Sequence, residues 1–156
     1  MAAAPPLPQI TPAHLPGGYK NLKPPLLYFG WSFEPEDLLQ WATRNGINTT
    51  VEFRGPVGPP KKEHNSFAAV IEPEVLKTLT DNAGTSNLRL RFEYGARSEG
   101  RFLLVISSNY SFARDQKVIT KPQIDVLDKY LKEQEVAKHD PAWHLDCELF
   151  KWRLLY

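Results

Sequence analysis

Three side chains able to exchange a proton or bind a metal recur at every second position near the end of the chain: His144, Asp146 and Glu148. A β-strand places alternate side chains on one face, so this spacing would bring an imidazole and two carboxylates together. Such a set can act as general acid and base, and these three residues are catalytic candidates. The spacing matches neither C-x-x-C nor H-E-x-x-H, so no metal site is predicted. The alternative is a solvated polar face.

Two other residues are considered for the same chemistry, Cys147 and His64. The only cysteine, Cys147, has the opposite parity, and we expect a small buried apolar residue there. Residues three apart in a strand face opposite sides, so His144 cannot activate this thiol. His64 is a fourth catalytic candidate, because it follows Lys61 and Lys62 in a loop where it could serve as a general base or simply be exposed.

A second group of candidates is basic. Arg89 and Arg91 alternate with apolar residues on a predicted strand, and Arg101 opens the next apolar run. Arginines beside aromatic side chains can bind single-stranded nucleic acid. The chain carries 19 Lys and Arg against 18 Asp and Glu, a net charge of +1, so nucleic acid is not the expected partner. An ordinary solvated face, with Glu93 pairing the arginines, is the alternative.

Aromatic residues make up 12% of the chain. Its four tryptophans and six tyrosines exceed what a small core needs, and such residues line interfaces and ligand pockets as well as cores. Trp143 and Trp152, on either side of the polar triplet, are predicted binding residues together with the three arginines. No cofactor is predicted.

The N-terminal residues form a separate segment by composition. Residues 1–25 contain seven of the 14 prolines, and proline fixes φ and removes a backbone donor. This segment is therefore predicted to be an extended, polyproline-like arm. Pro5-Pro6-Leu7-Pro8 matches the short motifs that some recognition domains bind, although no arginine or lysine flanks it. We divide the chain into this arm and a globular domain, residues 26–156.

The elements of the globular domain can be placed from apolar periods and from start and stop signals. The sequence predicts strands over 26–29, ended by Gly30, over 49–54 and over 66–71. It predicts helices from Pro35 to a cap at Asn45-Gly46, from Pro73 to Gly84, and after a capping box of Thr120 and Gln123. Residues 88–94 and 101–106 form a predicted hairpin, and 55–65 a long loop.

The last stretch, residues 142–156, has two interpretations. A strand with one bulge explains why the alternation of polar and apolar residues changes phase once, at Leu149-Phe150. A helix with Asp140 as its N-cap and Pro141 in its first turn is the alternative. The strand is favoured because the polar residues follow one alternation with a single interruption.

This order of elements is typical of an α+β fold, a single domain in which about three helices pack on a mostly antiparallel sheet. No motif is close enough to a known pattern to assign a family. We expect a non-catalytic intracellular binding domain that uses its aromatic surface and its proline-rich arm. The alternatives are a small enzyme or ligand-binding protein with a pocket between sheet and helices, and a single-stranded nucleic-acid binder.

The surroundings follow from composition. One cysteine and no export-signal pattern favour a cytoplasmic location. No run approaches the ~20 apolar residues that span a bilayer, so no membrane association is expected. The expected partner is a protein or a small molecule, and a terminal edge strand could pair with a second copy to give a homodimer.

Overall fold

The computed structural model describes residues 7–18, 22–53, 61–64, 72–85, 88–94, 102–146 and 153–154. Its centre is a four-stranded antiparallel sheet with the strand order β5-β6-β2-β7. These strands are β2 (Leu27–Phe33), β5 (Arg91–Tyr94), β6 (Phe102–Ser108) and β7 (Ala142–Leu145). With the helices described below, this arrangement confirms the predicted α+β single-domain fold.

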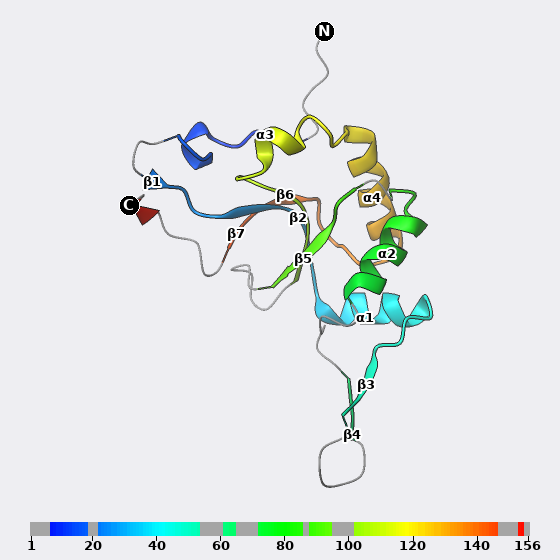
Figure 1. Cartoon of the computed structure of the whole chain (residues 1–156). Helices are drawn as coiled ribbons and strands as arrows, with labels where there is room; N and C mark the ends of the chain where they lie inside the picture. The colour runs from blue at the N-terminus through cyan, green and yellow to red at the C-terminus, as the bar shows by residue number, and fades with distance from the viewer. Residues whose placement is uncertain are drawn as a thin grey trace.

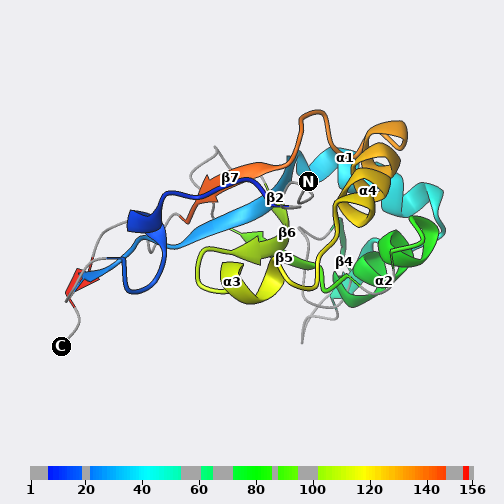
Figure 2. The ribbon, with the colours of Figure 1, turned by 90° about the horizontal axis from the view of Figure 1, so that it is seen from above.

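The three longest helices gather at one end of the sheet (Figures 1 and 2). The three predicted helices are present as α1 (Pro35–Arg44), α2 (Glu72–Asn82) and α4 (Lys121–Glu133), and α3 (Phe112–Asp115) and the 3-10 turn η1 (Pro12–His14) were not predicted. The capping box of α4 is confirmed, since the backbone N–H of Thr120 donates to Gln123 Oε1 at 2.9 Å. Gly46 takes φ +74° just after α1, as the predicted C-terminal cap requires.

Two short strand pairs lie outside the main sheet. β1 (Leu22–Lys23) pairs with β8 (Arg153–Leu154), and β3 (Thr50–Phe53) pairs with β4 (Lys61–His64) in a ribbon that projects from the body (Figure 1). β4 shows that the prediction of a loop over all of 55–65 was wrong. Its Lys-Lys-Glu-His sequence has no strand signal, and the strand exists through backbone pairing with the β-prone residues 50–53. The strand predicted over 66–71 lies outside the described residues.

The central strand β2 is longer than the sequence predicted. Gly30 was expected to end it, whereas the strand continues to Phe33. Gly30 lies where the register against β6 shifts, and a Cβ there would stand 1.9 Å from the carbonyl oxygen of Leu104. The glycine therefore permits close approach of two backbones in a bulge, and it is not a stop signal.

The main core lies between the sheet and the helices, and it includes Trp31, Leu38, Trp41, Leu79 and Leu127. Two indoles tie the layers together: Trp31 Nε1 donates to Asp128 Oδ1 at 2.8 Å, and Trp41 Nε1 donates to Tyr130 Oη at 3.3 Å. Buried indole N–H groups need such partners. The predicted hairpin is confirmed as β5 and β6, and β6 is buried on both faces.

The opposite side of the sheet carries a smaller cluster of Tyr28, Leu103 and Val105, which we call the outer face. Alternation along β6 explains the division, because Leu104 and Ile106 belong to the main core. β7 follows the same rule and confirms the strand interpretation for residues 142–145. The predicted change of phase at Leu149-Phe150 lies outside the described residues.

No helix within the described ranges is long and apolar enough to cross a membrane.

Candidate binding site

Several predicted site residues meet around Tyr28 on the outer face. Tyr28 on β2 stands directly opposite His144 on β7, and its hydroxyl donates to the carboxylate of Asp146. From β5, the Arg91 guanidinium lies over the Tyr28 ring, 5.5 Å from its centroid. Arg91 Nε also donates to Glu93 Oε1 at 2.8 Å, as the sequence predicted for this face. Strand register thus brings together residues that the sequence assigned to two separate sites.

The ionisation of this cluster is shifted toward neutral forms. Burial, reinforced by the nearby charges of Glu93 and Asp146, raises the pKa of Tyr28 to about 12. Burial also lowers the pKa of His144 below its usual 6.5, with a backbone hydrogen bond to Gly30 acting in the opposite direction. His144 Nε2 is buried and has no hydrogen-bond partner in the described part of the chain. Both aromatic side chains are therefore neutral near pH 7.

The phenol of Tyr28 does not suit acid-base catalysis. An efficient general acid or base has a pKa near the working pH, and the Tyr28 phenol is far above it and already bonded to Asp146. The centre of the outer face is also closed, because neither Leu103 nor Val105 has any exposed surface. Among the described residues, no three His, Cys, Asp or Glu side chains are grouped to hold a metal ion. The centre of the outer face is therefore a closed and hydrogen-bonded part of the sheet.

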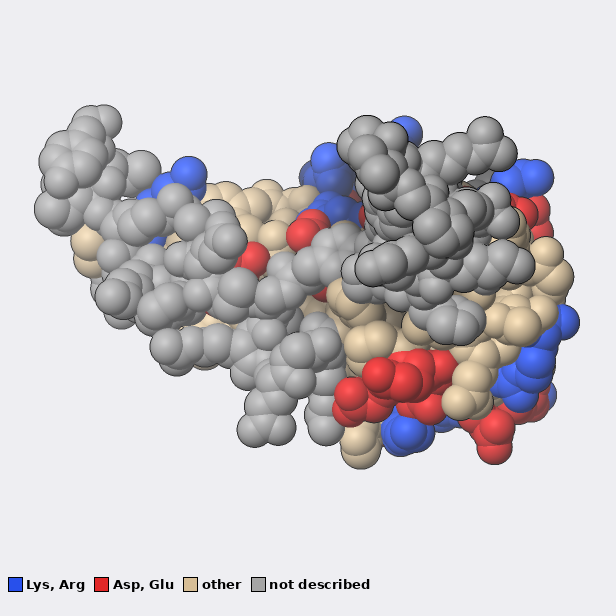
Figure 3. Space-filling model, turned by 90° about the horizontal axis from the view of Figure 1, so that it is seen from below, with Lys and Arg blue, Asp and Glu red and all other residues tan. Residues whose placement is uncertain are grey.

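Two further predicted residues, His64 and Arg89, do not join this cluster. The backbone of His64 lies in β4 on the projecting ribbon, in a different sheet from His144. Arg89 is exposed just ahead of β5. Glu148, Arg101 and Trp152 lie outside the described residues. The underside in Figure 3 shows acidic and basic groups side by side rather than a field of one sign.

Trp143 belongs to the other face of β7 and lies under the N-terminal arm. Its ring sits between two aromatic neighbours, with centroids 5.4 Å from Phe29 and 5.8 Å from Phe112. Its Nε1 donates to the carbonyl oxygen of Pro8 at 3.4 Å. Leu7, which precedes Pro8 in the chain, has no exposed surface and is part of the main core. The arm therefore buries the Leu7 side chain in the main core, and the carbonyl of Pro8 accepts a hydrogen bond from the indole of Trp143.

A second contact holds the arm farther along. The carboxamide of Asn109 donates to the carbonyl oxygens of His14 at 2.6 Å and Pro25 at 2.8 Å, and accepts from the N–H of Leu27 at 3.0 Å. The backbone N–H of Asn109 donates to the Leu27 carbonyl at 3.0 Å. Asn109 is itself buried, so one side chain joins β2 to two points of the N-terminal segment.

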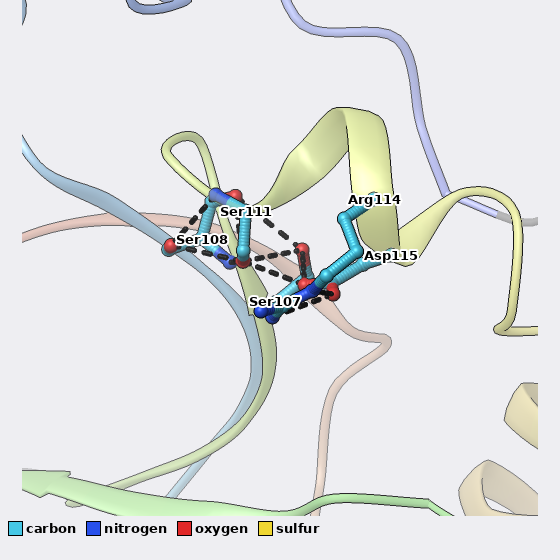
Figure 4. Close-up of polar contacts among 5 residues, drawn as sticks. All are labelled: Ser107, Ser108, Ser111, Arg114 and Asp115. Atoms are coloured by element: carbon cyan, nitrogen blue, oxygen red, sulfur yellow. Dashed lines mark hydrogen bonds and ion pairs between the residues drawn. The ribbon is translucent and has the colours of Figure 1, made fainter.

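The turn that presents Asn109 is fixed by a buried carboxylate (Figure 4). Asp115 Oδ2 accepts from the hydroxyls of Ser107 at 2.7 Å and Ser111 at 2.6 Å, and Asp115 Oδ1 accepts from Arg114 Nε at 2.9 Å. The Ser111 hydroxyl in turn accepts from the backbone N–H of Ser108 at 3.0 Å. A buried carboxylate satisfied in this way rigidifies its surroundings, so the turn holds Asn109 in place.

A pocket opens beside the arm. Pro8 lines it with Phe29 and Ile124, and its rim includes Asp128 and Pro141; the volume is about 270 Å³. We name Phe29, Asn109, Ile124 and Trp143 the arm-binding surface. Figure 2 shows the arm running along β7 and β2, on the side of the sheet where α3 and α4 also lie in Figure 1.

Sequence reasoning found only part of this surface. Trp143 was singled out as a binding residue, whereas Phe29 was noted as part of a strand and Asn109 was missed. An asparagine has no local signature when its partners are 82 to 95 residues away in the chain, as here. Apolar residues set among the prolines, such as Leu7 and Leu15, were the available signals that the arm is anchored.

Comparison with protein-family models, curated proteins and solved structures finds no match to this chain. The function of the chain must therefore be inferred from the residues of the arm-binding surface.

Proposed function

We propose that this protein is a non-catalytic binding domain that holds an extended segment of a protein partner on the arm-binding surface. One observation carries the proposal: the chain's own Leu7 and Pro8 are seated there as a ligand would be. An aromatic surface with a tryptophan N–H donor is the chemistry by which several recognition domains hold extended proline-rich segments.

The other two candidate functions have less support. Catalysis by His144 and Asp146 would need an open site, and the neighbouring Leu103 and Val105 have no exposed surface. The pocket beside Pro8 has a volume of about 270 Å³, and one of about 450 Å³ lies beside α1, so pocket size alone does not favour or exclude a small-molecule site. For nucleic acid, Arg91 is engaged by Glu93 and Tyr28, and the chain has a net charge of only +1.

A peptide added in trans tests the proposal directly. The probe is a fluorescent peptide with the sequence of residues 1–18, and the receptor is the full-length Leu7→Ala variant, in which the tethered arm has lost its anchor. We expect saturable binding by fluorescence anisotropy, with a Kd on the order of 100 µM. A folded variant that shows no binding up to about 1 mM peptide would contradict the proposal.

Two second-site changes locate the binding. Trp143→Phe in the Leu7→Ala background keeps an aromatic ring but removes the N–H donor, and it should weaken the peptide by about fivefold. Val126→Ala is the matched control, because Val126 is an exposed residue of α4, the helix that also carries Ile124. Equal losses for the two variants would place the peptide elsewhere.

A further inference from the structure

We infer that the arm is a built-in competitor for the arm-binding surface, and that the external partner is a proline-rich segment with a leucine followed by proline. This inference rests on the proposed function and adds the partner's chemistry and its regulation. The arm and the partner would occupy the same surface in turn.

The chemistry of the partner follows from what the surface takes from the arm. It takes the fully buried aliphatic side chain of Leu7, with Ile10 and Leu15 partly buried against the main core, while the ring of Pro8 stays exposed. It also takes one carbonyl, that of Pro8, which accepts from Trp143 Nε1. Proline next to leucine holds the backbone extended before binding, which lowers the entropy lost on docking. A segment with the same Leu-Pro pair supplies both groups.

The arm is built so that it can leave without disturbing the sheet. Within residues 7–18 no strand is formed. The hydrogen bonds of this segment to the rest of the protein include those from Trp143 to Pro8 and from Asn109 to His14, and Ile10 and Leu15 pack on the main core. When the arm departs, Asn109 keeps its bonds to Pro25 and Leu27. Gly17, at φ +83°, lets the chain turn at the end of this segment in a conformation that glycine adopts without strain.

The strength of the competition can be gauged from tethering. A short flexible tether gives an effective concentration on the order of a few millimolar. Against a Kd on the order of 100 µM for the same contacts in trans, the tethered arm would lower the apparent affinity for an external segment by about thirtyfold. In the unmodified protein the surface is therefore mostly closed, and only a segment that binds better than the arm would open it.

The test compares receptors and peptides. Labelled peptide 1–18 is titrated into the wild type, into Leu7→Ala and into Leu7→Val, which keeps most of the side chain should the alanine variant fail to fold. We expect the peptide to bind Leu7→Ala about thirtyfold more tightly than the wild type, with Leu7→Val between them. Val118→Ala, changed at an exposed residue, should behave like the wild type.

Two outcomes would overturn the inference while leaving the binding function intact. Equal, saturable affinity of the wild type and Leu7→Ala would show that the arm does not compete. Equal affinity for peptides carrying Leu7→Ala or Pro8→Ala and for the unchanged peptide would show that the Leu-Pro pair is not what the surface selects. Binding to neither receptor would instead refute the proposed function itself.

Discussion

Replacing Leu7 with alanine is the most informative single change in this protein. A fully buried leucine in a core typically costs 2–5 kcal/mol when it is truncated. Here the lower end applies, because the arm can detach as a unit, so the loss cannot exceed the free energy of docking the arm. We expect the free energy of unfolding to fall by about 2 kcal/mol, which for a chain of this size lowers Tm by about 4–8 °C.

Urea unfolding followed by tryptophan fluorescence and by circular dichroism measures this loss. The m-value should change little, since the domain keeps its core. Val118→Ala is the control, and we expect its stability to stay within about 0.5 kcal/mol of the wild type because this side chain is exposed. A loss of less than about 0.5 kcal/mol for Leu7→Ala would refute the packing of the arm, and with it the reasoning behind the binding surface.

Three further predictions concern single residues. Glu135 takes φ +60° just after α4, and its exposed side chain forms a 3.9 Å ion pair with Arg44. Glu135→Gly should therefore raise the free energy of unfolding by about 1 kcal/mol in thermal scans, and a decrease in that free energy would refute this. The pKa of His144 in the folded state lies below 6.5, so the unfolded chain binds the proton first as pH falls, and the free energy of unfolding should decrease as pH drops through and below 6.5. The urea midpoint of the His144→Gln variant should decrease less over the same pH range. An equal decrease in wild type and variant would count against the burial of His144. The pKa of Tyr28 is raised to about 12, so its stabilisation should be lost as pH rises from about 10 toward 12, and a tyrosinate absorbance transition near 12 should be missing from Tyr28→Phe.

Local signals predicted the helices well and the strand ends less well. Pro35 and Gly46, or Thr120 with Gln123, mark helix ends through bonds that form within a few residues. Gly30 shows the limit of such reasoning, since a glycine required by the approach of Leu104 looks the same in sequence as one that ends a strand. β4 was not predicted because its strand conformation depends on backbone pairing with β3 and not on its own composition.

The candidate site divides in the same way. Alternation correctly separated Trp143 from His144, because a strand must place them on opposite faces. The sequence could not show that Tyr28 stands opposite His144, since register across strands depends on the whole sheet. Nor could a proline-rich composition show whether the arm is free or docked. Docking of the arm depends on whether the Leu7 side chain packs in the main core, which is formed by residues far away in the chain.

The position of β2 has a consequence for the synthesis of the chain. β2 is flanked by β6 and β7, and Ser108, the last residue of β6, lies 75 residues after Phe33. At ribosomal rates of about 5–20 residues per second, the edge of β2 that pairs with β6 would wait roughly 4–15 s, and the edge that pairs with β7 would wait longer. Strand edges exposed for so long invite association with other nascent chains. A chaperone that shields the segment around Trp31 during translation should therefore raise the yield of folded protein.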